Sequence, residues 1–130
     1  MLLTARAECF LVAHPDPLNE AVKRLQAYAE AGADVLYAPG LRHRWEIETV
    51  VAAVSPKPVN VLISGDTGLR VVDLATMGVR RISVGSSLAR AAWTGFIHAA
   101  KLIAAEGSFA GFEGLTPYAE LNEFFKKNTV

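Results

Sequence analysis

A helix-to-strand junction that recurs along the chain constrains the fold more than any other feature of this sequence. Residues 28–40 read YAEAGADVLYAPG. A helix is expected to end at Gly32, because glycine readily adopts the left-handed backbone conformation that closes helices. The run Val35-Leu36-Tyr37 follows at once and is typical of a strand buried inside a parallel sheet. Residues 77–85, MGVRRISVG, repeat this order, so the chain is predicted to consist of copies of one α/β unit.

Hydrophobic periodicity predicts four strand–helix pairs followed by one further helix. The strands are expected at 2–12, 35–38, 59–63 and 81–84. The first helix is expected to begin with Asp16 as its cap and Pro17 in its first turn. The remaining helices are expected at 44–54, 69–76 and 88–105, and from 116 to about 126.

This alternation implies an α/β fold with a parallel sheet and right-handed crossovers. Two architectures remain open at this point: an open doubly wound sheet and part of a (β/α)8 barrel. No glycine-rich dinucleotide motif follows the first strand, which weakens the nucleotide-binding interpretation. A four-stranded parallel sheet on its own leaves two exposed edges, which proteins generally protect.

Length and composition narrow the class of protein. The 130 residues suffice for a single domain, expected to span 1–130. Thirteen basic residues balance thirteen acidic ones, which argues against a nucleic-acid partner or a polybasic membrane surface. The chain lacks an apolar run of about 18 residues, so no membrane span is expected. Its one cysteine, Cys9, cannot form an intrachain disulfide, and a reduced, cytoplasmic setting is the expectation.

Five segments, taken together, resemble one known family. Residues 5–8 (ARAE) resemble the A-R-T-D strand of the isocitrate lyase/phosphoenolpyruvate mutase superfamily, and residues 28–34 resemble its next helix–strand junction. Residues 57–62 (KPVNVL) resemble its P-V-N-V strand, and 78–85 with 88–92 resemble its final strand and helix. The order and spacing also match, most closely those of the mutase-like and 2-methylisocitrate lyase-like members.

The resemblance implies half of a (β/α)8 TIM barrel, strands five to eight with their helices, plus a C-terminal helix. It also implies a magnesium-dependent carbon–carbon lyase or phosphonomutase step on a small 2-oxo acid derivative, through a metal-stabilised enolate. The front half of the family barrel carries the D-x-D-x-G motif that holds Mg2+, and in the lyases a loop with a catalytic cysteine. Neither is found in this sequence, so the Mg2+ ligands are absent and this chain is expected to be inactive alone.

Candidate site residues follow from the resemblance and from strand alternation. Arg6 matches the family arginine that binds the acid group of the substrate, and a guanidinium can hold a carboxylate or phosphonate through paired hydrogen bonds. Glu8 shares its face and stands where the family often has Asp; the alternative is a simple Arg6–Glu8 ion pair. Asn60 is a further candidate, with bonding to neighbouring backbone as the alternative. Gly85 and Ser86 lead into a helix N-terminus, which suits either an anion or an ordinary serine cap.

Two kinds of partner are expected besides a small carboxylate or phosphonate substrate. One is a complementary N-terminal half-barrel, since this chain resembles only the C-terminal half of the family barrel. The other is a second copy, because two chains could pair the first strand of each with the last strand of the other and rebuild an eight-stranded barrel. The alternative function is therefore a non-catalytic, self-associating α/β module with a small-anion site.

Overall fold

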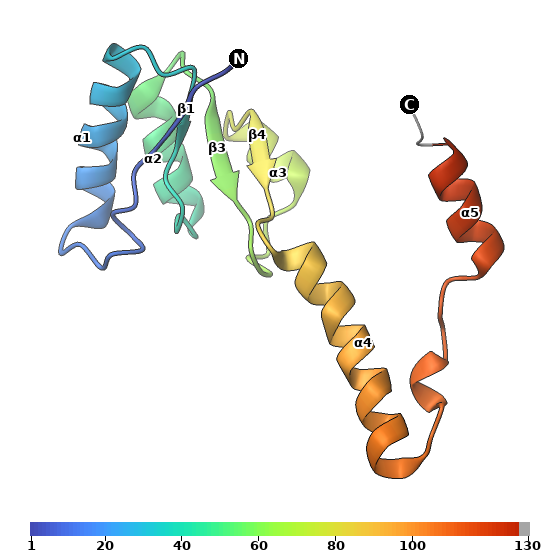
Figure 1. Ribbon diagram of the computed structural model, residues 1–130. Coiled ribbons are helices and arrows are strands. Elements are labelled where there is room, and N and C mark those ends of the chain that lie inside the picture. Colours follow the sequence, from blue (N-terminus) through green and yellow to red (C-terminus); the bar gives the residue numbers. More distant parts are fainter. Residues whose placement is uncertain (128–130) are drawn as a thin grey trace. The chain divides into compact units, whose positions relative to one another are not determined.

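The computed structural model describes residues 1–127, in which strands and helices alternate as the sequence predicts (Figure 1). The chain divides into two compact units, of which the second begins at Leu88. In chain order the elements are β1 (Thr4–Arg6), α1 (Pro17–Glu30), β2 (Val35–Tyr37), α2 (Arg44–Val54), β3 (Val59–Leu62), α3 (Val71–Thr76), β4 (Arg81–Ser83), α4 (Ser87–Glu106), a short 3-10 helix (Ala110–Phe112) and α5 (Tyr118–Lys127).

The four strands form one sheet in the order β1-β2-β3-β4, and every neighbouring pair is parallel. The predicted parallel α/β sheet is therefore confirmed. The sheet order follows the chain order, as expected when each helix crosses over to the next strand in the same direction. Among the described residues, β1 and β4 each have one strand neighbour, so each presents an open edge.

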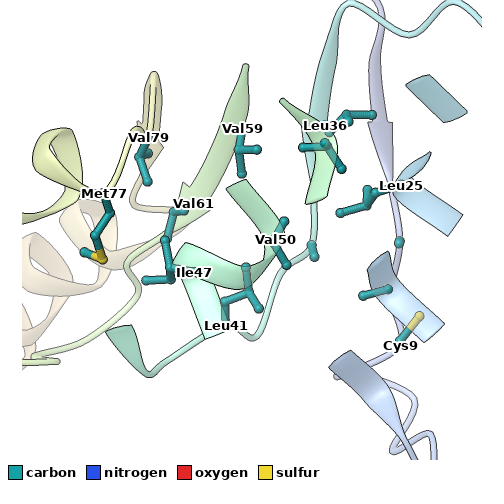
Figure 2. Packing of buried hydrophobic residues seen from close by; sticks show 14 of the residues in the cluster. Cys9, Leu25, Leu36, Leu41, Ile47, Val50, Val59, Val61, Met77 and Val79 are labelled. Carbon is teal, nitrogen blue, oxygen red and sulfur yellow. The ribbon is translucent and has the colours of Figure 1, made fainter. Parts of the chain in front are cut away.

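An apolar layer between the sheet and its helices forms the core of the first unit. Leu36, Val59 and Val61 are fully buried on one face of β2 and β3. They belong to the same cluster as Leu25 of α1 and Ile47 of α2 (Figure 2). Because successive strand side chains point to opposite faces, the residues between them, including Asn60, point away from these helices.

The first predicted strand is wrong in its length. The sequence predicts a strand over 2–12, whereas β1 covers only Thr4–Arg6. The chain then turns: the amides of Leu11 and Val12 both donate to the carbonyl oxygen of Glu8, at 2.9 and 3.1 Å. These local turn bonds replace strand pairing, and an apolar run by itself does not distinguish the two. The short 3-10 helix is likewise not predicted by hydrophobic periodicity.

The third helix begins later than the predicted position 69, because a side chain caps it at Arg70. The Asp73 carboxylate accepts a 2.9 Å hydrogen bond from the Arg70 backbone amide, and α3 starts at the next residue. Hydrogen bonding from the Arg70 side chain also lowers the pKa of Asp73. By contrast, the predicted helix 44–54 is confirmed with the same bounds.

A hydrogen bond across the sheet shows that the sheet is curved. Nη1 of Arg81, on β4, donates to Oγ1 of Thr4, on β1, at 3.3 Å. In a flat sheet these two strands would lie about 14 Å apart, three spacings of nearly 5 Å. An arginine side chain reaches only about 7 Å and a threonine hydroxyl about 2.5 Å from the Cα atom. The edge strands must therefore curl toward each other, and the face that carries Thr4 and Arg81 is the concave one.

The loop after β2 depends on Gly40, and a substitution there tests this packing. Gly40 has φ +105°, and a Cβ atom at this position would collide with Cβ of Phe10. We expect Gly40→Ala to lower the free energy of unfolding by roughly 2–4 kcal/mol, combining left-handed strain with overpacking. Gly32→Ala is the matched control, because Gly32 has φ +97° but open space around it. Urea denaturation of both variants measures the difference; equal losses would contradict the predicted collision.

Candidate functional site

The strand register lines up four polar side chains across the concave face. Arg6 pairs with Tyr37, Tyr37 with Asn60, and Asn60 with Arg81. Residues paired in neighbouring strands point to the same face of a sheet. These four residues, one from each strand, are called the polar row below. The row faces away from the buried side chains that pack against α1 and α2.

A concave pocket of about 420 Å³ lies over the polar row. All four residues of the row line it, and so do Thr4, Ser83 and Gly85. Two guanidinium groups thus face one small volume that carries no lining carboxylate. The charge and the polar groups of this pocket suit a small anion.

Arg6 is the last residue of β1, and its side chain contacts Glu8 and Tyr37 at the edge of the pocket. Its Nη2 atom lies 2.7 Å from Oε1 of Glu8, so the ion pair considered from the sequence is present. Its guanidinium carbon also lies 5.3 Å from the centre of the Tyr37 ring, in the range of a cation–π contact. The Arg6 and Glu8 side chains are 46% and 52% exposed, and exposed ion pairs contribute at most about 1 kcal/mol. An incoming acid group can therefore compete with Glu8 for Arg6.

Asn60 carries a buried polar atom that has no hydrogen-bond partner among residues 1–127. The residue is 2% exposed, and its Nδ2 atom donates to Oγ of Ser83 at 3.0 Å. Its Oδ1 atom is buried without a hydrogen bond among the described residues. Exchanging the two ends of the amide would let Ser83 donate to Oδ1 and would leave Nδ2 unpaired instead. In either orientation one end of the amide lacks a hydrogen bond. A buried polar group without a partner typically lowers the free energy of unfolding by about 1–3 kcal/mol.

Gly85 and Ser86 both follow β4, but only Gly85 lines the pocket. Gly85 lines the pocket with φ +55°, whereas Ser86 is exposed and does not line it. The next residue, Ser87, begins α4 and donates its hydroxyl to the carbonyl oxygen of Ser64 at 3.1 Å. Of the residues predicted from the sequence, Arg6, Asn60 and Gly85 therefore meet in one pocket. Glu8 is joined to that pocket through Arg6.

Sequence reasoning missed Tyr37 and Arg81. Arg81 stands two residues before Ser83 in a predicted strand, so alternation alone places both on the same face. Their position in the polar row depends on the register with β3 and β2, which the sequence does not reveal. Tyr37 looked like part of an apolar run and carried no separate signal.

The described residues do not fit the metal that the resemblance implies. Among residues 1–127, no group of three or more His, Cys, Asp or Glu side chains could hold a metal ion. The concave pocket instead presents arginine, amide and hydroxyl groups, which bind anions rather than Mg2+.

In the same described range, no helix is long and apolar enough to cross a membrane.

Comparison with known proteins decides the family. The family model for phosphoenolpyruvate phosphomutase matches residues 1–104 of this chain. The chain belongs to the phosphoenolpyruvate phosphomutase family. The resemblance to the phosphoenolpyruvate mutase/isocitrate lyase superfamily, predicted from five segments, is thereby confirmed.

Solved structures extend this result to the fold. A provisionally assigned lyase/mutase from Burkholderia cenocepacia J2315 is 43% identical, with a TM-score of 0.85, over 95% of this chain and 44% of that one. A provisionally assigned phosphonomutase from the same organism is 36% identical, with a TM-score of 0.66, over 77% and 41% of the two chains. An oxaloacetate acetylhydrolase in complex with the product oxalate is 23% identical, with a TM-score of 0.71, over 97% of this chain and 46% of that one, which shows a shared fold.

In the curated relatives, as in the solved structures, the match covers less than half of the relative's length. An uncharacterized protein of Mycobacterium tuberculosis is 29% identical over 121 residues, which cover 93% of this chain and 45% of that protein. The chain thus spans less than half the length of the curated relatives and solved structures that it matches.

The unpaired amide of Asn60 leads to a stability prediction. We expect Asn60→Leu to change the free energy of unfolding by no more than about 1 kcal/mol, because it removes an unsatisfied buried acceptor together with one hydrogen bond. Ser83→Ala is expected to be more destabilising, because it keeps the buried amide and leaves both of its ends unpaired. Urea denaturation compares the two variants. If Asn60→Leu cost more than about 3 kcal/mol, the side chain would be a structural requirement instead.

Proposed function

We propose that this chain forms strands five to eight of a (β/α)8 barrel of the phosphoenolpyruvate mutase/isocitrate lyase superfamily. In this arrangement the polar row is part of the inner wall. Three observations support the proposal: the sheet is parallel, it is curved, and its concave face is polar while its other face is packed on helices. The matched structures, covered to between 41% and 48% of their length, are consistent with such a division.

The function that the pocket supports best is binding of the acid group of a small 2-oxo acid derivative. The carrying observation is that Arg6 and the half-satisfied amide of Asn60 line the same pocket. Arg6 can hold a carboxylate or phosphonate through two parallel hydrogen bonds. Asn60 can donate Nδ2 to the ligand while Oδ1 accepts from the Ser83 hydroxyl, which would satisfy the whole amide.

In the proposed complete barrel, these residues bind and orient the substrate. The reaction class is carbon–carbon bond cleavage or a phosphonomutase step. The metal site and the remaining catalytic groups would belong to the other half of the barrel, because the described residues do not form them. The chain by itself is therefore proposed to bind the substrate's acid group without turning the substrate over.

A binding titration tests the role of Arg6. We expect pyruvate to shift the backbone amide signals of the polar row in two-dimensional NMR spectra of the full chain. Arg6→Gln should weaken this binding at least tenfold, through loss of a charge-assisted pair of hydrogen bonds. Glu8→Gln should strengthen it by up to about fivefold, since a competing carboxylate is removed from an exposed pair.

A second arginine provides the matched control for charge. Arg24 also forms a 2.7 Å ion pair, with Glu20, but it lies on α1 outside the pocket. Arg24→Gln should leave the pyruvate affinity within about twofold of the unsubstituted chain. If Arg24→Gln and Arg6→Gln weakened binding equally, the effect would reflect net charge and the proposed site would be wrong.

Partner choice follows from the open edges of β1 and β4. A polypeptide that resembles the remaining part of the relatives could pair with both edges and close the barrel, as could a second copy of this chain. We expect the first, because the relatives' own remaining strands are the surface that this sheet matches. Size-exclusion chromatography of this chain, alone and mixed with such a polypeptide, should give a one-to-one complex in the mixture. A stable homodimer that ignores the added polypeptide would favour the self-associating module instead.

A further inference from the structure

The register places a second arginine in the pocket, opposite Arg6. Arg81 pairs with Asn60, and Asn60 is joined through Tyr37 to Arg6. Arg6 and Arg81 are therefore the two ends of the polar row, on the two edge strands of a sheet that curls inward. Both line the same pocket of about 420 Å³. A ligand held by Arg6 would extend along the row toward Arg81.

The two arginines differ in how their charge is compensated. Arg6 has the Glu8 carboxylate at 2.7 Å. Arg81 has no carboxylate within ion-pair distance among residues 1–127, and its hydrogen bond goes to the neutral hydroxyl of Thr4 at a long 3.3 Å. The Arg81 guanidinium therefore has five hydrogen-bond donors and no anionic partner among the described residues, and Arg81 lines the pocket. Exchanging the Thr4 hydroxyl for an anionic oxygen would replace a weak neutral bond with stronger, charge-assisted ones.

The unsatisfied amide lies beside Arg81 in the row. Asn60 is the register neighbour of Arg81 and is almost fully buried, and one end of its amide has no hydrogen-bond partner within the described part of the chain. A buried polar group of this kind needs an explanation, and a bound ligand is a sufficient one. When the Ser83 hydroxyl donates to Oδ1, Nδ2 is the unpaired end of the amide. One acid group near this end of the row could then accept hydrogen bonds from both Nδ2 of Asn60 and the Arg81 guanidinium.

From these observations we infer that Arg81 is a specificity-determining residue that binds a second acid group of the ligand. This inference rests on the proposed function, in which Arg6 binds the first acid group. It assigns the two arginines separate roles: Arg6 accepts any small carboxylate, whereas Arg81 distinguishes a ligand with two acid groups from one with a single acid group.

Malonate and its monoamide, malonamate, form a matched pair of probes. They have nearly the same size, but malonamate carries one carboxylate and malonate carries two. In NMR titrations of the full chain at low salt, we expect malonate to bind about tenfold more tightly than malonamate. Arg81→Gln should reduce this preference to less than twofold by weakening malonate binding alone. Arg6→Gln should weaken the binding of both probes.

The neighbouring residue supplies the control for charge. Arg80→Gln removes the same charge one position earlier, from an exposed side chain that does not line the pocket. It should keep the tenfold preference for malonate. Arg81→Lys keeps the charge without the planar fork and should give an intermediate preference. The dispersion of the amide spectrum reports whether each variant is folded, and Arg81→Lys carries the test if Arg81→Gln does not fold.

The outcomes separate this inference from the proposed function. If the unsubstituted chain bound neither probe at the polar row, both the proposed function and the role of Arg81 would be wrong. If both probes bound with equal affinity and both depended on Arg6, the proposed function would stand and the role of Arg81 would be overturned. The same conclusion would follow if Arg80→Gln removed the preference as fully as Arg81→Gln does.

Discussion

The apolar contact between the inner strands and helices α1 and α2 determines which face of the sheet carries polar chemistry. Leu36, Val59 and Val61 are driven against Leu25 and Ile47 because their burial removes apolar surface from water. Strand side chains alternate between faces, so this burial turns Tyr37 and Asn60 to the opposite side. The polar row is a direct consequence of how the core packs.

Curvature converts that polar face into a pocket. On a flat sheet, the ends of the row would lie too far apart to act on one small molecule. The hydrogen bond between Arg81 and Thr4 spans β1 and β4, so the edge strands lean toward each other over Asn60. A parallel sheet that curls in this way is the expected form of part of a barrel, in which twist and strand tilt close the sheet on itself.

The two arginines of the pocket differ in how far a nearby carboxylate neutralises their charge. The two ends of the polar row are therefore not equivalent. Arg6 is partly neutralised by Glu8 and rests on the Tyr37 ring. Arg81 has only a hydroxyl partner among the described residues, and Asn60 beside it is half satisfied. Groups of this kind reduce stability in an empty pocket and become favourable when a complementary ligand arrives. The arginine, amide and hydroxyl groups that line this pocket are of the kind that suit a small anion.

Helical periodicity and strand alternation predicted the order of the main strands and helices and the bounds of α2. The family came from the resemblance of short segments to known proteins. The same resemblance, together with strand alternation, pointed to three of the pocket residues, Arg6, Asn60 and Gly85. Tertiary structure alone decided where β1 ends, which residues share the polar row, and that Arg81 lines the same pocket as Arg6. Strand register and sheet curvature arise from pairing between segments far apart in the chain, and no local stretch of sequence encodes the offset between them.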